Sequence, residues 1–201
     1  KVFHRKNFLL CARNLAFYSL VINRINVLRK DIVFWQDGIF PFNSYLKKLP
    51  GRDLLAQLHP SKKINKIYLL SKKNKKNFEY LNKKFKNTAT IIQLELPFGN
   101  LDSIKKSFTK FKVHAGNKTL FLIAIPTPKQ EFLGSVIMNR FDNAKVLCVG
   151  GALDYLSGNI SKPPLFFSSK IEFIWRLRGD FFRRFNRLVL SGIFLIKNYL
   201  S

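Results

Sequence analysis

Three short polar segments of this sequence, residues 36–38, 126–131 and 150–154, directly follow apolar runs. The first contains Asp37, which we predict to act as a general base. A carboxylate at the end of a strand can accept a proton from an incoming hydroxyl group. The alternative is that Asp37 caps the next helix, and spacing alone favours that alternative.

The other two segments favour the binding of an anion. Pro128 suits the first turn of a helix, so residues 128–131 would offer polar side chains and backbone N–H groups to a ligand. An ordinary helix start explains the same residues equally well. Gly150 and Gly151 would let a ligand approach the backbone closely. Neither GxGxxG nor GxxxxGK[ST] occurs in the chain, so the phosphate signal is weak.

The sequence gives little support for a metal site or for a catalytic nucleophile. The aspartates form no DxD pair, the histidines are scattered at His4, His59 and His114, and no GxSxG motif is present. We therefore expect no metal ion and no cofactor. Cys11 and Cys148 lie in apolar runs, which predicts two buried core thiols in a reducing compartment.

Apolar and amphipathic segments alternate along most of the chain. Helices are predicted at 14–29, 75–86, 101–114 and 130–140. Strands are predicted at 8–12, 31–35, 66–70, 90–94, 119–125 and 145–149. This alternation predicts a Rossmann-like α/β fold, with a mainly parallel sheet and helices on both faces. Ligands of such sheets bind beyond the carboxyl ends of the strands.

The pattern changes after residue 164, so we predict an α/β domain at 1–164 and a basic, aromatic helical appendage at 165–201. Gly179-Asp180 is the expected break between two helices of this appendage. No apolar run reaches the ~20 residues of a membrane-spanning helix.

The net charge of +25 favours an anionic partner. Lysines dominate residues 62–86, where a solvated helix face is the preferred explanation. Arg176, Arg183 and Arg187 alternate with aromatic residues, and the planar guanidinium suits a diphosphate. A membrane-surface helix or simple solvation of a packed helix would explain the same arginines. Nucleic acid binding is a further alternative, although no nucleic-acid motif is visible.

Several motifs, in this order along the chain, resemble the WecG/TagA/CpsF family of glycosyltransferases. Near the N-terminal end these are Asp37-Gly38 and 51–53 (Gly-Arg-Asp). Further along they are 128–131 (Pro-Lys-Gln-Glu), 149–158 (Val-Gly-Gly-x-x-Asp-x-x-x-Gly), 162–164 (Lys-Pro-Pro) and 172–177 (Glu-x-x-x-Arg-Leu). The resemblance covers nearly the whole chain and is weakest at 55–120.

The resemblance implies an inverting transfer of a sugar, N-acetylmannosamine-like or a related hexose, from a UDP-sugar. The implied acceptor is a polyprenyl-diphosphate-linked sugar of cell-envelope polysaccharide or teichoic acid synthesis. It also implies a cytoplasmic protein, peripheral on the inner face of the plasma membrane through its appendage, with Asp37 as base and no metal. The implied substrate-binding residues are Asn14, Gly38, Asp53, Gln130, Glu131, Gly150, Gly151, Asp154, Arg176, Arg183 and Arg187.

The chain also departs from the family pattern. Thr-x-Asn reads Ala12-Arg13-Asn14, a Gly-Gly-like loop reads 71–74 (Ser-Lys-Lys-Asn), Pro126 replaces a glycine, and 96–99 (Leu-Pro-Phe-Gly) replaces a Gly-Tyr turn. An inactive relative that scaffolds a polysaccharide complex is therefore an alternative to the enzyme. The donor sugar, the linkage and assembly into a homo-oligomer are left open by the sequence.

Overall fold

The computed structural model describes residues 6–21, 31–37, 48–59, 64–160 and 181–197. Six strands form one sheet in the order β2-β1-β6-β5-β3-β4, and every adjacent pair is parallel. The strands are β1 (Phe8–Arg13), β2 (Ile32–Gln36), β3 (Lys66–Ser71), β4 (Thr90–Glu95), β5 (Thr119–Ile123) and β6 (Lys145–Cys148). The predicted Rossmann-like α/β fold is confirmed.

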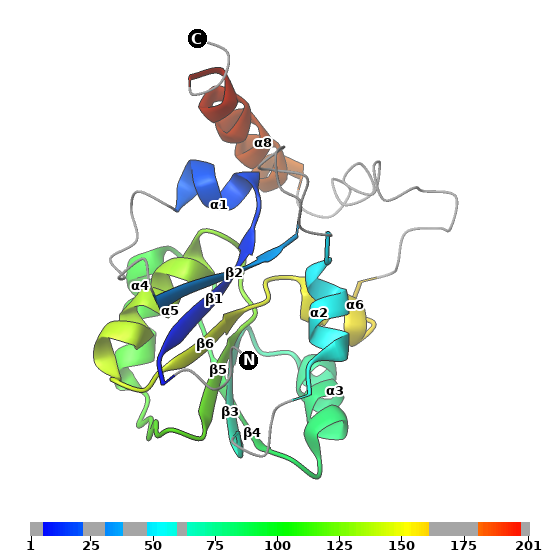
Figure 1. Cartoon of the computed structure of the whole chain (residues 1–201), viewed down its shortest axis with the longest axis vertical. Coiled ribbons are helices and arrows are strands. Elements are labelled where there is room, and N and C mark those ends of the chain that lie inside the picture. The colour runs from blue at the N-terminus through cyan, green and yellow to red at the C-terminus, as the bar shows by residue number, and fades with distance from the viewer. Residues whose placement is uncertain (1–5, 22–30, 38–47, 60–63, 161–180, 198–201) are drawn as a thin grey trace.

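Helices cover both faces of the sheet (Figure 1). One face carries α1 (Leu15–Leu20), α4 (Leu101–Lys110) and α5 (Lys129–Arg140). The other carries α2 (Gly51–Gln57), α3 (Lys75–Phe85) and α6 (Ala152–Leu156). Successive side chains of a strand point to opposite faces, so Leu9 joins the first core and Leu10 the second. Burial on both faces explains why the strands read as continuous apolar runs.

Helix α3 shows how the sequence specifies its elements. Asn74 caps the helix, because its side-chain oxygen accepts a hydrogen bond of 3.2 Å from the N–H of Asn77. Asn77, Leu81 and Phe85 recur at helical spacing and are buried against the sheet. The lysines between them mostly face outward, which agrees with the predicted solvated helix face.

Several predicted boundaries need correction. Helix α4 ends at Lys110 and not at 114, because the backbone of Phe111 is extended. Strand β5 ends at Ile123. The sequence analysis missed α2 and α6, which have only seven and five residues. Of the helix predicted at 14–29, the described part is α1, and 22–30 lie outside the described residues.

The C-terminal helix α8 (Phe181–Leu195) packs against α1 (Figure 1). The hydroxyl oxygens of Ser19 and Ser191 lie 3.2 Å apart, within hydrogen-bonding distance. Since α1 follows the carboxyl end of β1, α8 is placed beside the carboxyl edge of the sheet. The predicted break at Gly179-Asp180 and the boundary at 164 lie outside the described residues, so the division into two domains stays a prediction.

Candidate functional site at the carboxyl edge of the sheet

Because all six strands are parallel, their carboxyl ends share one edge of the sheet. Asn14 follows β1, Asp37 follows β2, Gln130 lies beyond β5, and Gly150 lies beyond β6. After β1 the chain turns toward the face of the sheet that carries α1. After the neighbouring strand β6 it turns toward the opposite face, which carries α6. Connections that diverge from adjacent strands in this way open the crevice in which such sheets bind ligands.

Gln130 joins the loop after β5 to the loop after β6. Its side chain is only 4% exposed. Its amide oxygen accepts a hydrogen bond of 2.8 Å from the N–H of Gly150, and its amide nitrogen donates to the hydroxyl of Thr127 at 3.0 Å. Gly150 has a φ of 53°, a left-handed conformation that favours glycine. Gln130 therefore holds the Gly150-Gly151 turn in place.

Glu131 is a buried carboxylate beneath these loops, and its side chain is 1% exposed. One oxygen, Oε1, accepts from the Thr127 hydroxyl at 2.9 Å and from the Gln130 amide at 2.8 Å. Burial raises the pKa of the adjacent Cys11 and Cys148 thiols, and the negative charge of Glu131 adds to both shifts. Gln130 and Glu131 thus build the loops, and direct contact with substrate stays a prediction for both.

Asp37 meets the start of α2. Its Oδ1 accepts a hydrogen bond of 3.0 Å from the N–H of Gly51, the first residue of that helix. The contact resembles the capping role that competed with catalysis in the sequence analysis. The same Gly51 lies next to α6, because a Cβ placed on it would lie 3.5 Å from the Cβ of Ala152. Gly51 therefore connects Asp37 to the start of α6, which directly follows Gly151.

Asp53 and Asn14 both lie at the starts of helices at this edge. Asp53 is in the first turn of α2, and its Oδ1 lies 3.7 Å from the Nε of Arg52 in a partly exposed ion pair. Asn14 caps α1, because its Oδ1 accepts a hydrogen bond of 3.0 Å from the N–H of Phe17. These contacts explain both residues structurally, and their predicted substrate roles remain untested.

Asp154 belongs to a polar cluster between α3 and α6. Its Oδ1 accepts a hydrogen bond of 2.9 Å from the side-chain amide of Asn77. The oxygen of that amide accepts from the Ser157 hydroxyl and, at 2.8 Å, from the side chain of Asn159. The sequence analysis missed Asn77. A polar residue on the apolar stripe of α3 was the available signal, because buried amides need partners.

Lys129 is a second residue that the sequence analysis assigned no role of its own. Its ammonium group donates to the carbonyl oxygen of Gly99, in the loop after β4. The first residue of α5 therefore holds the loop that follows the edge strand β4. Together, Lys129, Gln130 and Asn77 connect the loops that follow β3, β4, β5 and β6, so the edge is a cross-linked surface.

The remaining predicted site residues cannot be placed. Gly38 and Arg176 lie outside the described residues, as do the side chains of Arg183 and Arg187, whose backbone belongs to α8. Within the described part, no three side chains of His, Cys, Asp or Glu are arranged to hold a metal ion. The expectation that no metal is needed stays a prediction. None of the described helices is long and apolar enough to cross a membrane.

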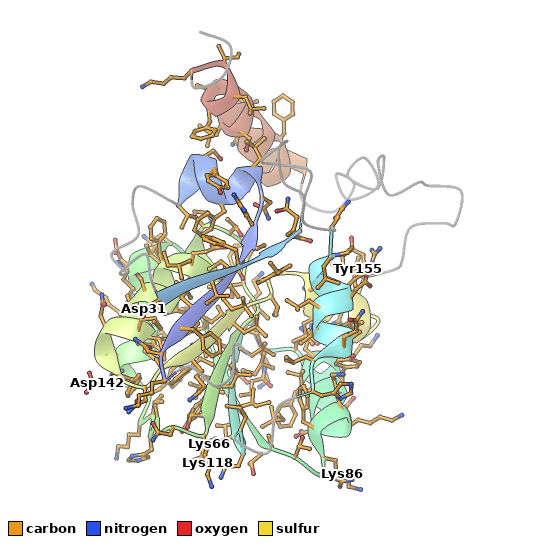
Figure 2. The ribbon with its side chains drawn as sticks, in the orientation of Figure 1. Asp31, Lys66, Lys86, Lys118, Asp142 and Tyr155 are labelled. Atoms are coloured by element: carbon orange, nitrogen blue, oxygen red, sulfur yellow. The ribbon has the colours of Figure 1, made fainter. Side chains whose placement is uncertain are left out.

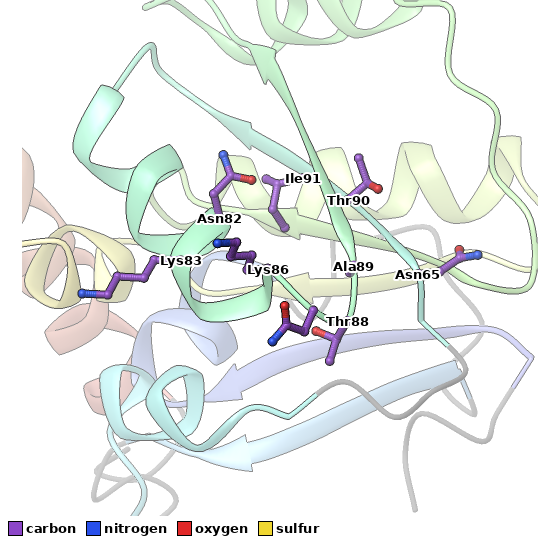
Figure 3. A pocket seen from close by; sticks show the side chains of 9 residues that line it. Asn65, Asn82, Lys83, Lys86, Thr88, Ala89, Thr90 and Ile91 are labelled. Atoms are coloured by element: carbon purple, nitrogen blue, oxygen red, sulfur yellow. The ribbon is translucent and has the colours of Figure 1, made fainter.

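An open depression lies at the opposite, amino edge of the sheet (Figure 3). It has a volume of about 840 Å³ and lies between the end of α3 and the start of β4. Its lining includes Lys83, Lys86 and Thr88. Figure 2 shows Lys66, Lys86 and Lys118 at this same end of the molecule, far from α8. The lining combines lysines, amides, hydroxyls and two apolar residues, and none of the lining residues is a carboxylate.

Comparison with known proteins agrees with this arrangement. The family model described as "Glycosyl transferase WecG/TagA/CpsF family" matches residues 42–200, and no curated protein matches the chain. The matched range includes Asp53, Gln130, Gly150 and Asp154, and it begins after Asp37. The chain therefore belongs to the WecG/TagA/CpsF family of glycosyltransferases.

Proposed function

We propose that this protein is an inverting glycosyltransferase that moves a sugar from a UDP-sugar to a polyprenyl-diphosphate-linked acceptor. Family membership indicates a glycosyltransferase of cell-envelope polysaccharide synthesis that uses a nucleotide-sugar donor and a lipid-linked acceptor. Our proposal adds three details: the nucleotide is UDP, the acceptor is linked to polyprenyl diphosphate, and the reaction inverts the anomeric configuration.

The observation that carries the proposal is the hydrogen bond between Asp37 and the N–H of Gly51. It holds a half-buried carboxylate at Gly51, the residue of α2 at which a Cβ would lie 3.5 Å from the Cβ of Ala152 in α6. A carboxylate that accepts a backbone N–H at a helix start is favoured in its ionised form. An ionised carboxylate is what a general base requires.

In the proposed step, Asp37 accepts the proton of the acceptor hydroxyl as the hydroxyl oxygen attacks the anomeric carbon of the donor. A new C–O bond forms on the face opposite to UDP, while the bond from the anomeric carbon to the UDP oxygen breaks. The electron pair leaves with UDP, so negative charge develops on the diphosphate. Backbone N–H groups or cations near this oxygen would lower the barrier.

The donor diphosphate is proposed to lie over the Gly150-Gly151 turn. A Cβ built on Gly151 would meet no heavy atom within 4 Å, so this exposed backbone is open to a ligand. We assign Arg176, Arg183 and Arg187 to the diphosphate. The packing of α8 against α1 supports this assignment for the last two, because it brings their helix to the carboxyl edge.

Helix α8 is also the proposed contact with the membrane surface. Its exposed apolar side chains are 44–56% accessible and follow helical spacing, and they are Phe185, Val189, Leu190 and Ile193. Ile196, directly after the helix, is 59% accessible. A helix with such an apolar stripe, in a segment whose sequence is also rich in arginine, suits an anionic bilayer surface. This placement supports a peripheral protein on the cytoplasmic face, where a lipid-linked acceptor would be presented.

The base is tested by Asp37→Asn, with Asp31→Asn as the matched control. Asp31 precedes the same strand at its amino end, so it shares the chemistry but not the site. We expect Asp37→Asn to lower the transfer rate about 10²- to 10⁴-fold at unchanged fold, and Asp31→Asn to leave it unchanged. Equal rates for the two variants would remove Asp37 from the mechanism.

The donor is tested by thermal unfolding with a panel of nucleotide sugars. A ligand that binds only the folded state raises Tm by mass action. A UDP-sugar should raise Tm more than the corresponding GDP- or CDP-sugar. Stabilisation by another nucleotide alone would overturn the assignment of UDP.

A further inference from the structure

Phe98 is unusually exposed for an aromatic residue of this protein. It lies in the loop after β4, and its side chain is 82% accessible, more than any other large apolar side chain reported as exposed in the described residues. The others of this group lie on α8 or, in the case of Ile196, directly after it.

The loop that carries Phe98 is fixed on both sides. Before it, the N–H of Leu96 donates to the carbonyl oxygen of Ser71 at 2.8 Å. After it, Lys129 binds the carbonyl oxygen of Gly99, and the side chain of Asn100 caps α4. Hydrogen bonds therefore hold the chain on both sides of Phe98, while its ring is exposed.

One lysine contacts this ring, and three more lie close to that lysine in the sequence. The ammonium nitrogen of Lys72 lies 3.7 Å from the centroid of the Phe98 ring, in a cation–π contact. Four exposed lysines occupy the end of β3 and the start of α3, and they are Lys72, Lys73, Lys75 and Lys76. We call these lysines and Phe98 the Phe98 patch.

The charge of the Phe98 patch is only partly balanced. Glu95 lies 3.7 Å from Lys73, and Glu79 lies 3.7 Å from Lys75. Four positive and two negative charges leave a local excess of +2. No acidic residue occupies the first turn of α3, where one would balance the helix dipole. An exposed apolar ring in contact with one lysine of a group with excess positive charge is complementary to an anionic bilayer, whose headgroups attract lysine while its interface accepts the ring.

We propose that the Phe98 patch is a second membrane-docking surface, separate from α8, and that it binds anionic phospholipid headgroups while the Phe98 ring enters the interface. The proposal rests on the proposed function, which brings the carboxyl edge to a lipid-linked acceptor. Phe98 follows β4 at that edge, and α8 is attached there through α1, so the sheet edge between them would face the bilayer.

The test measures binding of the full chain to vesicles made of equal parts phosphatidylglycerol and phosphatidylcholine. Phe98→Ser should lower the vesicle affinity roughly three- to tenfold, because it removes the apolar ring. Lys72→Gln/Lys73→Gln should lower it about tenfold and reduce its salt dependence. The charge-matched control is Lys83→Gln/Lys86→Gln, which changes two exposed lysines at the other end of α3 and its following turn (Figure 3). It should leave the affinity nearly unchanged.

A direct readout comes from Phe98→Trp. Brominated lipids should quench the additional fluorescence of this variant beyond the quenching of the parent protein. Absence of added quenching would overturn the proposal, as would an equal loss of affinity in the two double-lysine variants. If Phe98→Ser instead weakened RNA binding and left vesicle binding intact, the patch would be a nucleic-acid surface and the proposal would be wrong.

Failure of this proposal can be told apart from failure of the proposed function. Asp37→Asn should bind vesicles as the parent does, because its change is on another loop. A protein that docks through Phe98 but transfers no sugar would refute the enzyme and keep the docking surface. If the parent protein transfers sugar and the Phe98→Ser variant binds vesicles as tightly as the parent, the docking surface is refuted and the enzyme assignment is kept.

Discussion

Replacing Gln130 with methionine tests whether the carboxyl edge is held together by side-chain hydrogen bonds. Methionine keeps the length of the side chain and fits an apolar environment, but it neither donates nor accepts a comparable hydrogen bond. The change removes contacts to Gly150, Thr127 and Glu131 at 2.8, 3.0 and 2.8 Å. All of them lie in the region where we place the donor.

The size of the expected stability loss follows from the burial of the Gln130 side chain. Gln130 is 4% exposed, so its former partners cannot readily turn to water. Leaving one buried polar group unsatisfied costs about 1–3 kcal/mol, and more when the partner is charged, as an ionised Glu131 would be. We therefore expect the free energy of unfolding to fall by about 3 kcal/mol, which corresponds to a Tm decrease of roughly 6–12 °C for a chain of this size.

Urea unfolding of Gln130→Met is compared with that of Gln93→Met. Gln93 makes one long hydrogen bond of 3.4 Å to the carbonyl oxygen of Lys72 at the surface. Its loss should cost less than about 0.5 kcal/mol. Amide hydrogen exchange at Gly150 should also accelerate in Gln130→Met. Equal stability losses in the two variants, with unchanged exchange at Gly150, would refute the reasoning.

Three other predictions follow from named contacts. Gly150→Ala should cost about 1–2 kcal/mol because of its φ of 53°, whereas Gly151→Ala should cost much less; similar thermal stabilities would contradict this. Asn77→Leu should cost about 2 kcal/mol in urea unfolding, because it removes the partners of the α6 cluster; a loss under about 0.5 kcal/mol would oppose that role. Burial raises the pKa of both core thiols, so unfolding releases their protons once the pH exceeds the ordinary value of 9.0. Stability should therefore fall above that pH by up to about 1.4 kcal/mol per pH unit per thiol, and a Cys11→Ala/Cys148→Ala variant should show a shallower slope.

The sheet could be predicted from the sequence because its physical cause is local. Strands that are buried on both faces need unbroken apolar runs. Segments such as 66–70 and 119–123 are runs of this kind, and a buried strand is the structure that they predict most strongly. The helix at 75–86 could be predicted equally well, because Asn74 is a strong N-cap residue and apolar residues recur at helical spacing after it.

Contacts between loops could not be predicted, because they depend on the order of the strands in space. Nothing in the spacing of Gln130 and Gly150 indicates that they bond, and the same holds for Asp37 and Gly51. The short helix α2 was also missed. Its N-cap is Pro50, which makes no side-chain cap, and its seven residues carry little periodic signal.

The central claim is that the nucleotide is bound by the loops at the carboxyl edge. Hydrogen exchange measured by mass spectrometry, with and without UDP, tests it most directly, because it reports where a ligand protects the backbone. We predict added protection in peptides covering 48–53, 124–131 and 149–153, with no change in 82–91, which line the depression at the amino edge. Protection confined to 82–91, with none at the three strand-end segments, would contradict the account.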